Sequence, residues 1–498
     1  MSDDINKSNE TAVIASTAST GKGSSRHKDV IEPTSDGKKK KSKPKKQPSV
    51  FETGQNQLAK KVSEQLENTL AHDVIDGQWY RRSGDKYEQI PDAKAKQQIQ
   101  RELEAIHPSF SFGFLTGVTE FVKSRFMVNR WTDNSHEIAL KNGVFNIKDK
   151  ALRQYKPTDR FRNQLPFAFD ENAKCPDTEM ILFTLANDDA DIFQMLLACM
   201  YCVLLKRYDL QKYFELIGPG GTGKSTFIDL LTLLVGDCNR AVTDLKELEN
   251  NRFESAALYR KYLAVITDSA QWRGDVAKLK ALTGGDPIRN EVKNRQQSEP
   301  FIFTGIVFIA TNEPITSKDY TDGLSRRRIP VYFTHKITDA DKAQYPDGIN
   351  AVFNRELSGI LNLVLAQDAD SMVDLIVNPS DTMAAAKLQT ELDTNPLLKW
   401  ADDFLIQVGE GNETPIGQKD ASPLGGLYAS YCAHCDNSGN SAVSLNRFSN
   451  LVEQQLQSRD IPTRRHRRSH SRVLEGLALR SPNDGDIPTL LSGHSMTA

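Results

Sequence analysis

A glycine-rich loop between an apolar strand and a helix constrains the fold of this chain more than any other feature. Residues 214–227 read Phe-Glu-Leu-Ile-Gly-Pro-Gly-Gly-Thr-Gly-Lys-Ser-Thr-Phe and match the pattern G-x-x-x-x-G-K-[ST] at every fixed position. Glycines let backbone N–H groups approach a phosphate closely, and the N-terminus of the following helix attracts the same anion. The pattern therefore predicts a strand–loop–helix unit that binds a nucleoside triphosphate.

The positions of this loop have distinct expected contacts. Lys224 is expected to reach the β- and γ-phosphates of ATP, and the Ser225 hydroxyl to coordinate Mg²⁺. The apolar run 227–235 predicts a helix that ends at Gly236. The residues expected to bind the nucleotide are Gly218, Pro219, Gly220, Gly221, Thr222, Gly223, Lys224, Ser225 and Thr226.

Length and composition indicate a polar chain of several domains. The 498 residues are 38% hydrophobic and 26% charged, with a formal net charge of −2. Such a length predicts roughly two to four domains. No apolar run approaches the ~18 residues of a membrane-spanning helix, and the first residues contain no signal-peptide core. We therefore expect a cytoplasmic protein without a membrane partner.

The six cysteines are too sparse to form a disulfide scaffold. Cys199 and Cys202 lie in an apolar run, where packing is the expected role. Cys432 and Cys435 could supply two ligands to a metal ion, but no second pair nearby completes four. The sequence leaves open whether they bind metal.

A second apolar strand, downstream of the loop, ends in an acidic residue. This residue, Asp268, is expected to hold Mg²⁺ beside Ser225. Ser269 stands where a second acid usually orients the attacking water. The water-activating group therefore stays open, with Glu215 and Asp275 as alternatives.

A third apolar run, 301–312, predicts a strand of a parallel sheet covered on both faces. Asn312 at its end is placed to hold the attacking water or to sense the γ-phosphate. Arg326 and Arg327 follow, and either could stabilise charge on the γ-phosphate of a neighbouring subunit. On this hypothesis Arg327→Ala abolishes hydrolysis but not ATP binding. The alternative is a solvated basic turn.

Two basic segments are candidates for DNA contact. A glycine–acid turn after residue 283 leads into a hairpin that carries Lys293 and Arg295, and such a hairpin suits the backbone of a single strand. Near the C-terminus, three predicted helices and a basic hairpin fit a winged-helix domain, with the Ser444 helix toward a groove. The arginines expected on phosphates are Arg464, Arg465, Arg467 and Arg468.

The N-terminal half is organised differently. Residues 1–50 have almost no large apolar residue and end in a lysine-rich run, so they predict a disordered basic tail. Helical patterns cover 57–70 and 94–106, with short strands around Trp79 and Tyr80. Two apolar runs around an Asn-Gly pair in 138–147 predict a hairpin.

These elements together resemble superfamily 3 helicases of the AAA+ class. Within them the chain looks most like the helicase half of phage and plasmid primase-helicases of the satellite-phage and poxvirus type. The residues that carry the resemblance are Gly218 to Ser225, the strand ending at Asp268, 279–286, Ala310-Thr311-Asn312-Glu313, Arg326-Arg327, and upstream 140–144 with Pro157 and Leu165-Pro166.

The resemblance implies an ATP-driven replicative DNA helicase of a phage or plasmid-like element, located in a bacterial or virus-infected cell. It implies a homohexameric ring with ATP bound between subunits and a hairpin around Lys293 lining a central pore. Single-stranded and duplex DNA are the implied ligands. The chain lacks room for a primase domain, so a separate primase or other replisome proteins are candidate partners.

Two other hypotheses are weighed beside this one. A nucleotide-switched DNA-binding, packaging or replication-initiation ATPase that does not unwind would fit Ser269 after Asp268. A small-molecule kinase would leave the basic hairpin and the arginines without a role.

The expected fold is α/β, with an AAA+-like ATPase core built on a parallel sheet. The expected domains are a disordered tail (1–50), a mixed α+β N-terminal domain (51–165), a helical collar (166–212), the ATPase (213–345), a helical connector (346–394), a winged-helix domain (395–481) and a disordered tail (482–498).

Overall fold

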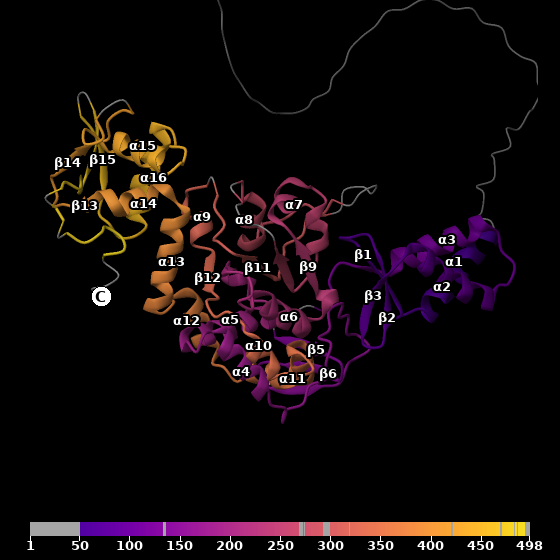
Figure 1. Ribbon diagram of the computed structural model, residues 1–498. Coiled ribbons are helices and arrows are strands. Elements are labelled where there is room, and N and C mark those ends of the chain that lie inside the picture. Colours follow the sequence, from indigo (N-terminus) through magenta and orange to yellow (C-terminus); the bar gives the residue numbers. More distant parts are fainter. Residues whose placement is uncertain are drawn as a thin grey trace, which may run out of the picture. The chain divides into compact units, whose positions relative to one another are not determined.

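The computed structural model describes residues 50–132, 136–267, 272, 274–291, 299–317, 319–419, 422–468, 471–482, 484–485 and 487–493. The predictions for residues 1–49, and for Asp268, Ser269, Lys293 and Arg295, concern positions outside these ranges. Figure 1 shows the elements in sequence colours. No helix in the described ranges is long and apolar enough to cross a membrane.

The N-terminal region packs three helices on a four-stranded sheet of order β3-β2-β1-β4 around one apolar core. The second helix buries Ala95, Ile99 and Leu103, which recur every four residues on one face. The helix expected at 57–70 ends five residues earlier, and Leu70 begins a strand instead. The elements are α1 Val50–Gln65, β1 Leu70–Asp73, β2 Trp79–Ser83, β3 Lys86–Ile90, α2 Asp92–Ile106, α3 Phe112–Arg125 and β4 Met127–Val128.

The predicted hairpin at 138–147 is confirmed. Strands β5 (Glu137–Leu140) and β6 (Gly143–Asn146) pair antiparallel, and β7 (Ala151–Arg153) adds a third strand. A Cβ atom at Gly143 would lie 2.5 Å from the carbonyl oxygen of Arg153, so only glycine fits this turn.

The central region is a five-stranded sheet of order β12-β8-β11-β10-β9, and every neighbouring pair is parallel. The expected parallel α/β core is therefore present. Its elements are α4 Pro176–Leu185, α5 Ala190–Leu205, η1 Tyr208–Leu210, β8 Tyr213–Ile217, α6 Lys224–Val235, η2 Asp237–Asn239, β9 Arg240–Thr243, α7 Leu245–Asn250, η3 Glu254–Leu258, β10 Leu263–Ile266, α8 Ala277–Gly284, β11 Ile306–Thr311, α9 Asp322–Ser325 and β12 Arg328–Tyr332.

Both faces of this sheet are covered, as continuous apolar strands require. Phe214 and Leu216 of β8 point into one core with α5 and α6, whereas Tyr213 points into the other core with α7 and α8. Figure 1 shows these helices on the two sides of the strands. The strand expected over 301–312 is shorter, because Phe301 instead pairs with Ile288 in an isolated antiparallel bridge.

The helices flanking the sheet belong to the same core as the sheet itself. After β12 the chain forms the helices α10 Asp339–Ala343, α11 Ile349–Leu365, α12 Ala369–Val377 and α13 Asp381–Thr394. Helix α11 buries Phe353, Ile360 and Leu361 against α6, α4 and α5. The expected collar and connector are therefore packed parts of the central unit, because their apolar faces share one core with the sheet.

The C-terminal region has a separate core containing Trp400, Tyr431 and Phe448. Three helices and the expected basic hairpin are present, and the small sheet has the order β14-β16-β15. Cys432 and Cys435 are buried among these apolar side chains. The elements are α14 Pro396–Phe404, β13 Leu405–Gln407, β14 Glu413–Pro415, α15 Leu427–Asn437, α16 Leu445–Gln457, β15 Arg464–Arg467, β16 Arg472–Glu475 and β17 Leu477–Leu479.

The prediction of a disordered tail from 482 is wrong for residues 487–493. Leu490 and Leu491 are buried in the C-terminal core. The carboxylate of Asp402 accepts backbone N–H bonds from Leu491 at 2.7 Å and Ser492 at 3.0 Å. Two apolar residues and a capping carboxylate are enough to fix this short segment, although its polar composition resembles a tail.

Candidate functional site

The glycine-rich loop connects β8 to α6 and has the conformation that the motif requires. Gly221 and Gly223 adopt φ values of +84° and +90°, which L side chains rarely adopt. A Cβ at Gly223 would also lie 2.2 Å from Leu185 Cδ2, and one at Gly218 would lie 2.1 Å from the Phe333 carbonyl oxygen. The loop can therefore keep this shape only with glycine at these positions.

Lys224 begins α6 and turns its ammonium back over the loop. Its Nζ donates to the carbonyl oxygens of Gly218 and Pro219, the latter at 2.8 Å, and lies 3.3 Å from Asn312 Oδ1. Burial lowers the pKa of Lys224. An ammonium held by loop carbonyls beside a helix N-terminus is placed to meet an anion.

A cavity of about 600 Å³ opens at this helix N-terminus. Gly223 at the N-cap offers no side-chain acceptor to the first N–H groups, which leaves them for a phosphate. Gly218 and Pro219 do not line the cavity but hold Lys224. The lining residues are Gly220, Gly221, Thr222, Gly223, Lys224, Ser225, Thr226, Thr267, Ala310, Thr311, Asn312, Ile337 and Lys342. Backbone donors and an ammonium around this volume could hold a phosphate group, and Ser225 belongs to the same lining.

Asn312 lies beside Lys224 because the strands before them are neighbours. β11 pairs with β8 in parallel, so the residues after both strands meet at the same edge of the sheet. β10 is the next strand along, and Thr267 after it lines the cavity. Thr267 is the last described residue directly after this strand, and Asp268 lies outside the described residues.

The two alternative acids do not line the cavity. Glu215 is fully buried, with its carboxylate 2.9 Å from Arg328 Nε and accepting the Ile315 N–H at 2.6 Å. Burial raises the pKa of Glu215, and the charge of Arg328 opposes that shift. Asp275 is exposed, away from the lining residues. Glu215 therefore lies outside the cavity lining, and its carboxylate is engaged in a structural ion pair.

Arg326 and Arg327 lie at the opposite end of the sheet from the loop of the same subunit. They precede β12, which runs parallel to β8, whereas the loop follows β8. Five residues of strand separate the two ends by roughly 16 Å at about 3.3 Å per residue. Neither arginine can therefore contact a γ-phosphate on its own Lys224.

The arginines of this segment have three different environments. Arg326 is exposed. Arg327 is only 9% exposed, and its Nη1 donates to the Gly323 carbonyl oxygen. Arg328 forms the buried pair with Glu215 and donates to the Ile315 carbonyl oxygen at 2.7 Å. Of the two predicted residues, Arg326 is the one whose head group is free to reach another molecule.

A basic cluster surrounds Arg326, and the sequence reasoning did not identify it. Lys212 Nζ donates to the Arg326 carbonyl oxygen at 2.6 Å. Burial, together with the charges of Lys387, Arg326 and Arg327, lowers the pKa of Lys212 to about 8. Lys212 immediately precedes β8, so its position beside the other strand starts could have been found from the parallel sheet alone. Unneutralised cations gathered at one edge favour an anionic partner.

Two further residues of the nucleotide cavity were not predicted from the sequence. Ile337 packs over the loop and donates its backbone N–H to the Gly221 carbonyl oxygen at 3.0 Å. Lys342 of α10 lines the same cavity. Neither belongs to a motif, because both reach the loop only through the fold of the chain after β12.

The C-terminal basic hairpin and α16 enclose a second cavity of about 500 Å³. Arg465 donates to Asn450 Oδ1, and Arg472 donates to Asn446 Oδ1 at 3.0 Å. Arg467 also lines this cavity. Of the four predicted arginines, Arg465 thus contacts the predicted helix, and Arg467 lines the cavity beside it.

The two remaining arginines of that hairpin lie outside the cavity lining. Arg464 is exposed. Arg468 pairs with Glu413 through two hydrogen bonds, which partly neutralises it. Ser444 occupies the predicted N-cap position of α16, but its side chain makes no capping hydrogen bond. In the described ranges no group of three or more metal-ligating side chains occurs, around Cys432 and Cys435 or elsewhere.

Comparison with known families finds two matching segments. Residues 54–185 match a family described as D5 N terminal like, and residues 216–328 match a family of unknown function, DUF5906. An uncharacterised mitochondrial protein of Marchantia polymorpha, ymf20, is 36% identical over 67 residues. That segment is 14% of this chain and 40% of the length of the Marchantia protein.

Solved structures with distant similarity include the apo A form of the NrS-1 C-terminal region. It aligns with 82% of this chain and 96% of its own, with 13% identity and a TM-score of 0.43. A second structure of that region has 11% identity and a TM-score of 0.45 over the same shares of both chains. A ligand-bound JCV helicase aligns with 45% of this chain and 75% of its own, with 15% identity and a TM-score of 0.24. TM-scores this low do not establish a common fold.

Proposed function

We propose that this protein is an ATP-dependent replicative DNA helicase of a phage or plasmid-like element. The observation that carries the proposal is the separation of two half-sites on one parallel sheet. Lys224, Ser225 and Asn312 lie at one end, and Arg326 lies exposed at the other. Such half-sites are completed when a neighbouring subunit brings its arginine to the nucleotide.

A closed ring repeats that contact at every interface, and a homohexamer is the assembly proposed here. The nucleotide is ATP with Mg²⁺ held by Ser225 and Asp268. The match of residues 54–185 to the D5 N-terminal-like family supports a relation to primase-helicases. In this proposal the hairpin with Lys293 and Arg295 follows single-stranded DNA through the ring, in the cytoplasm of a bacterial or virus-infected cell. A separate primase or other replisome proteins are the proposed partners.

The C-terminal region is proposed to be a winged-helix domain that contacts duplex DNA. Its order of one helix, two short strands, two helices and a basic hairpin, with the sheet order β14-β16-β15, supports this assignment. Asn446 and Asn450 lie four residues apart on the exposed side of α16, where an amide can read a base edge. Arg465, which donates to Asn450, and Arg467 line the same cavity, where a phosphate backbone would pass.

Strand displacement by the purified protein tests the proposed function. With a forked duplex, ATP and Mg²⁺, we expect single-stranded product to accumulate, and we expect none with a non-hydrolysable ATP analogue. The second candidate is an initiation or packaging ATPase that switches without unwinding, favoured by Ser269 beside Asp268. DNA-stimulated hydrolysis without any displaced strand would select that candidate.

Replacing Arg465 and Arg467 together with Gln should weaken duplex binding and make it less dependent on salt. Each phosphate contact adds about −0.9 to the slope of log K against log salt on duplex DNA, so losing two should reduce the slope by about 1.8. Fluorescence anisotropy from low to moderate salt measures this. Arg355→Gln, an exposed arginine on α11, is the control and should leave the slope unchanged. An unchanged slope in the double variant would contradict the proposed contact.

A further inference from the structure

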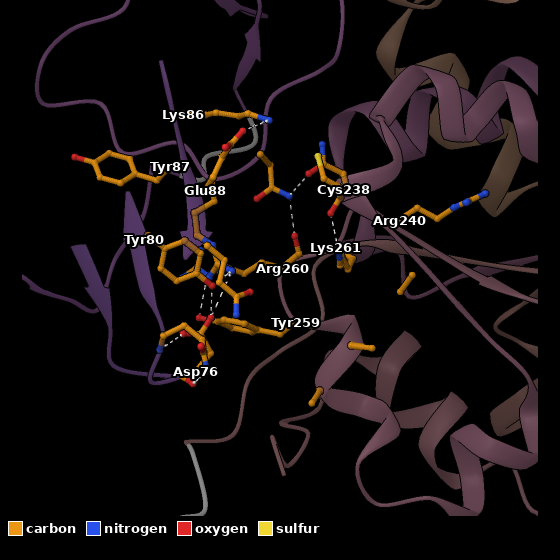
Figure 2. Close-up of a pocket in the computed structure, with 18 of the residues that line it drawn as sticks. Asp76, Tyr80, Lys86, Tyr87, Glu88, Cys238, Arg240, Tyr259, Arg260 and Lys261 are labelled. Atoms are coloured by element: carbon orange, nitrogen blue, oxygen red, sulfur yellow. Dashed lines mark hydrogen bonds and ion pairs between the residues drawn. The ribbon is translucent and has the colours of Figure 1, made fainter. Parts of the chain in front are cut away.

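A second large cavity lies away from the nucleotide loop, between two sheet edges. It measures about 710 Å³ and is lined by β3, the edge strand of the N-terminal sheet, and β9, the edge strand of the central sheet. Figure 2 shows Lys86 and Glu88 on one side and Cys238, Arg240 and Lys261 on the other. We call this cavity the β3–β9 crevice.

The floor of the crevice is a buried polar network that joins its two sides. Asp73 is fully buried and accepts hydrogen bonds from Arg162 Nη1 at 2.9 Å and Tyr259 OH at 3.0 Å. The Arg162 guanidinium lies 4.1 Å from the ring centroid of Tyr80 and 5.2 Å from that of Tyr259. Because these groups satisfy one another, the two walls are held together and the crevice is preformed.

The walls above this floor are positively charged. Five basic side chains line the crevice against two acidic ones, Asp76 and Glu88, and Asp73 on the floor is a third acid, paired with Arg162. Both lining acids already form ion pairs: Asp76 lies 3.5 Å from Arg162, and Glu88 lies 3.2 Å from Lys86. The basic side chains are Lys86, Arg162, Arg240, Arg260 and Lys261.

The cations on the β9 side differ in how far they are compensated, and Arg260 lies 3.8 Å from the buried carboxylate of Asp73. Lys261 donates to the Cys238 carbonyl oxygen, and Arg240 pairs with the highly exposed Asp237 at 3.1 Å. Burial, and to a smaller extent Arg162, lower the pKa of Lys261. The Asn163 and Asn290 amides add neutral polar groups to the lining. An anion with repeated charges and hydrogen-bond acceptors suits such a wall.

We propose that the β3–β9 crevice binds the sugar–phosphate backbone of single-stranded DNA, as a contact separate from the nucleotide cavity and the C-terminal basic hairpin. This inference rests on the proposed function, since a helicase produces single-stranded DNA and basic grooves commonly follow its backbone. Both walls are edge strands, which could form backbone hydrogen bonds with an extended peptide. The positive charge of the walls favours a phosphate backbone over a neutral peptide.

The chain carries its own probe for this site. Cys238 lines the crevice and is exposed, whereas the other five cysteines are buried. A maleimide under native conditions should therefore label Cys238 first, because a thiol must be accessible to react. Peptide mapping by mass spectrometry identifies the labelled residue and gives its rate.

We expect saturating oligo-dT to slow labelling of Cys238 about tenfold, because the bound strand covers the thiol. ATP with Mg²⁺ alone, in the absence of DNA, should not slow it. Protection by ATP alone would show a small-anion site or a subunit contact, and equal protection by polyglutamate would show a site for acidic peptide. Either result overturns the proposal.

A double variant tests the charges themselves. Lys86→Gln with Arg240→Gln removes one cation from each wall, at side chains that are 25% and 29% exposed. Oligo-dT should then protect Cys238 less, and the salt slope of binding should fall by about 1.4, or about 0.7 per single-strand phosphate. The control is Lys94→Gln with Arg355→Gln, which removes the same charge from exposed positions elsewhere.

The outcomes separate this inference from the proposed function. Suppose that the protein displaces strands and anisotropy shows oligo-dT bound, but Cys238 is labelled at the same rate with and without DNA. That result would contradict the crevice proposal and leave the helicase proposal intact. Protection of Cys238 without any strand displacement supports the crevice and counts against the helicase.

Discussion

Lys224→Ala protein is expected to lose ATP hydrolysis by about 10²–10³-fold, the usual effect of removing one preorganised group that stabilises developing charge. The ammonium lies over the loop and is bonded to the Gly218 and Pro219 carbonyls beside Asn312. Lys342 lines the same cavity from α10 but pairs with Asp339. Phosphate release at saturating ATP measures turnover, and strand displacement should be lost with it.

The matched control for this change is Lys246→Ala, an exposed lysine on α7. It should hydrolyse ATP at the wild-type rate. The folded state of both variants is compared by thermal unfolding without nucleotide, where Lys224→Ala should be close to wild type because burial penalises that ammonium. Full hydrolysis in Lys224→Ala would place the reaction elsewhere in the chain.

Arg326→Ala is expected to reduce turnover by ~10³–10⁵-fold while ATP affinity stays near wild type. The exposed guanidinium lies at the far end of the sheet from its own loop, so its loss leaves that loop intact. Arg327→Ala should have a smaller effect on chemistry, since Arg327 is folded against Gly323 within its own subunit. The structure thus shifts the expectation from Arg327 to Arg326. Stopped-flow binding of a fluorescent ATP analogue, with turnover, separates affinity from rate.

Mixing the two inactive proteins tests whether Arg326 acts on a neighbouring subunit. In a mixed ring, an Arg326→Ala subunit supplies an intact Lys224 and its Lys224→Ala neighbour supplies an intact Arg326, so some sites become complete. We expect hydrolysis to rise above that of either protein alone. No recovery on mixing, with exchange of subunits verified by native mass spectrometry, would rule out the shared site.

Much of the motor could be predicted from sequence because its signals are local. The strand, loop and helix around Lys224 are contiguous, and their geometry follows from glycine conformations and helix termini. Asn312 could be placed beside Lys224 because parallel neighbouring strands end at one edge. The helical pattern of α2 and the Asn-Gly hairpin at 142–143 were equally local and were confirmed.

Other expectations failed where a residue's partner lies far along the chain. Glu215 was a candidate base because it lies next to the loop in sequence. Its carboxylate forms an ion pair with Arg328, which lies more than a hundred residues later. Leu490 and Leu491 sit in a polar terminal stretch, yet the C-terminal core receives them. Helix α3, with two glycines, forms because it buries Leu115, Val118 and Val122 against distant elements.

The sequence by itself determined that this chain has a phosphate-binding loop, apolar strands of the kind found in a parallel α/β sheet and a basic C-terminal hairpin, since each depends on residues a few positions apart. The order of those strands came from the tertiary structure. Only the tertiary structure showed that Arg326 is exposed while Arg327 and Arg328 are engaged, and that Glu215 forms an ion pair. It alone also showed that β3 and β9 line a cationic crevice. The physical reason is that charge and burial depend on what packs against a side chain, and those neighbours come from anywhere in the fold.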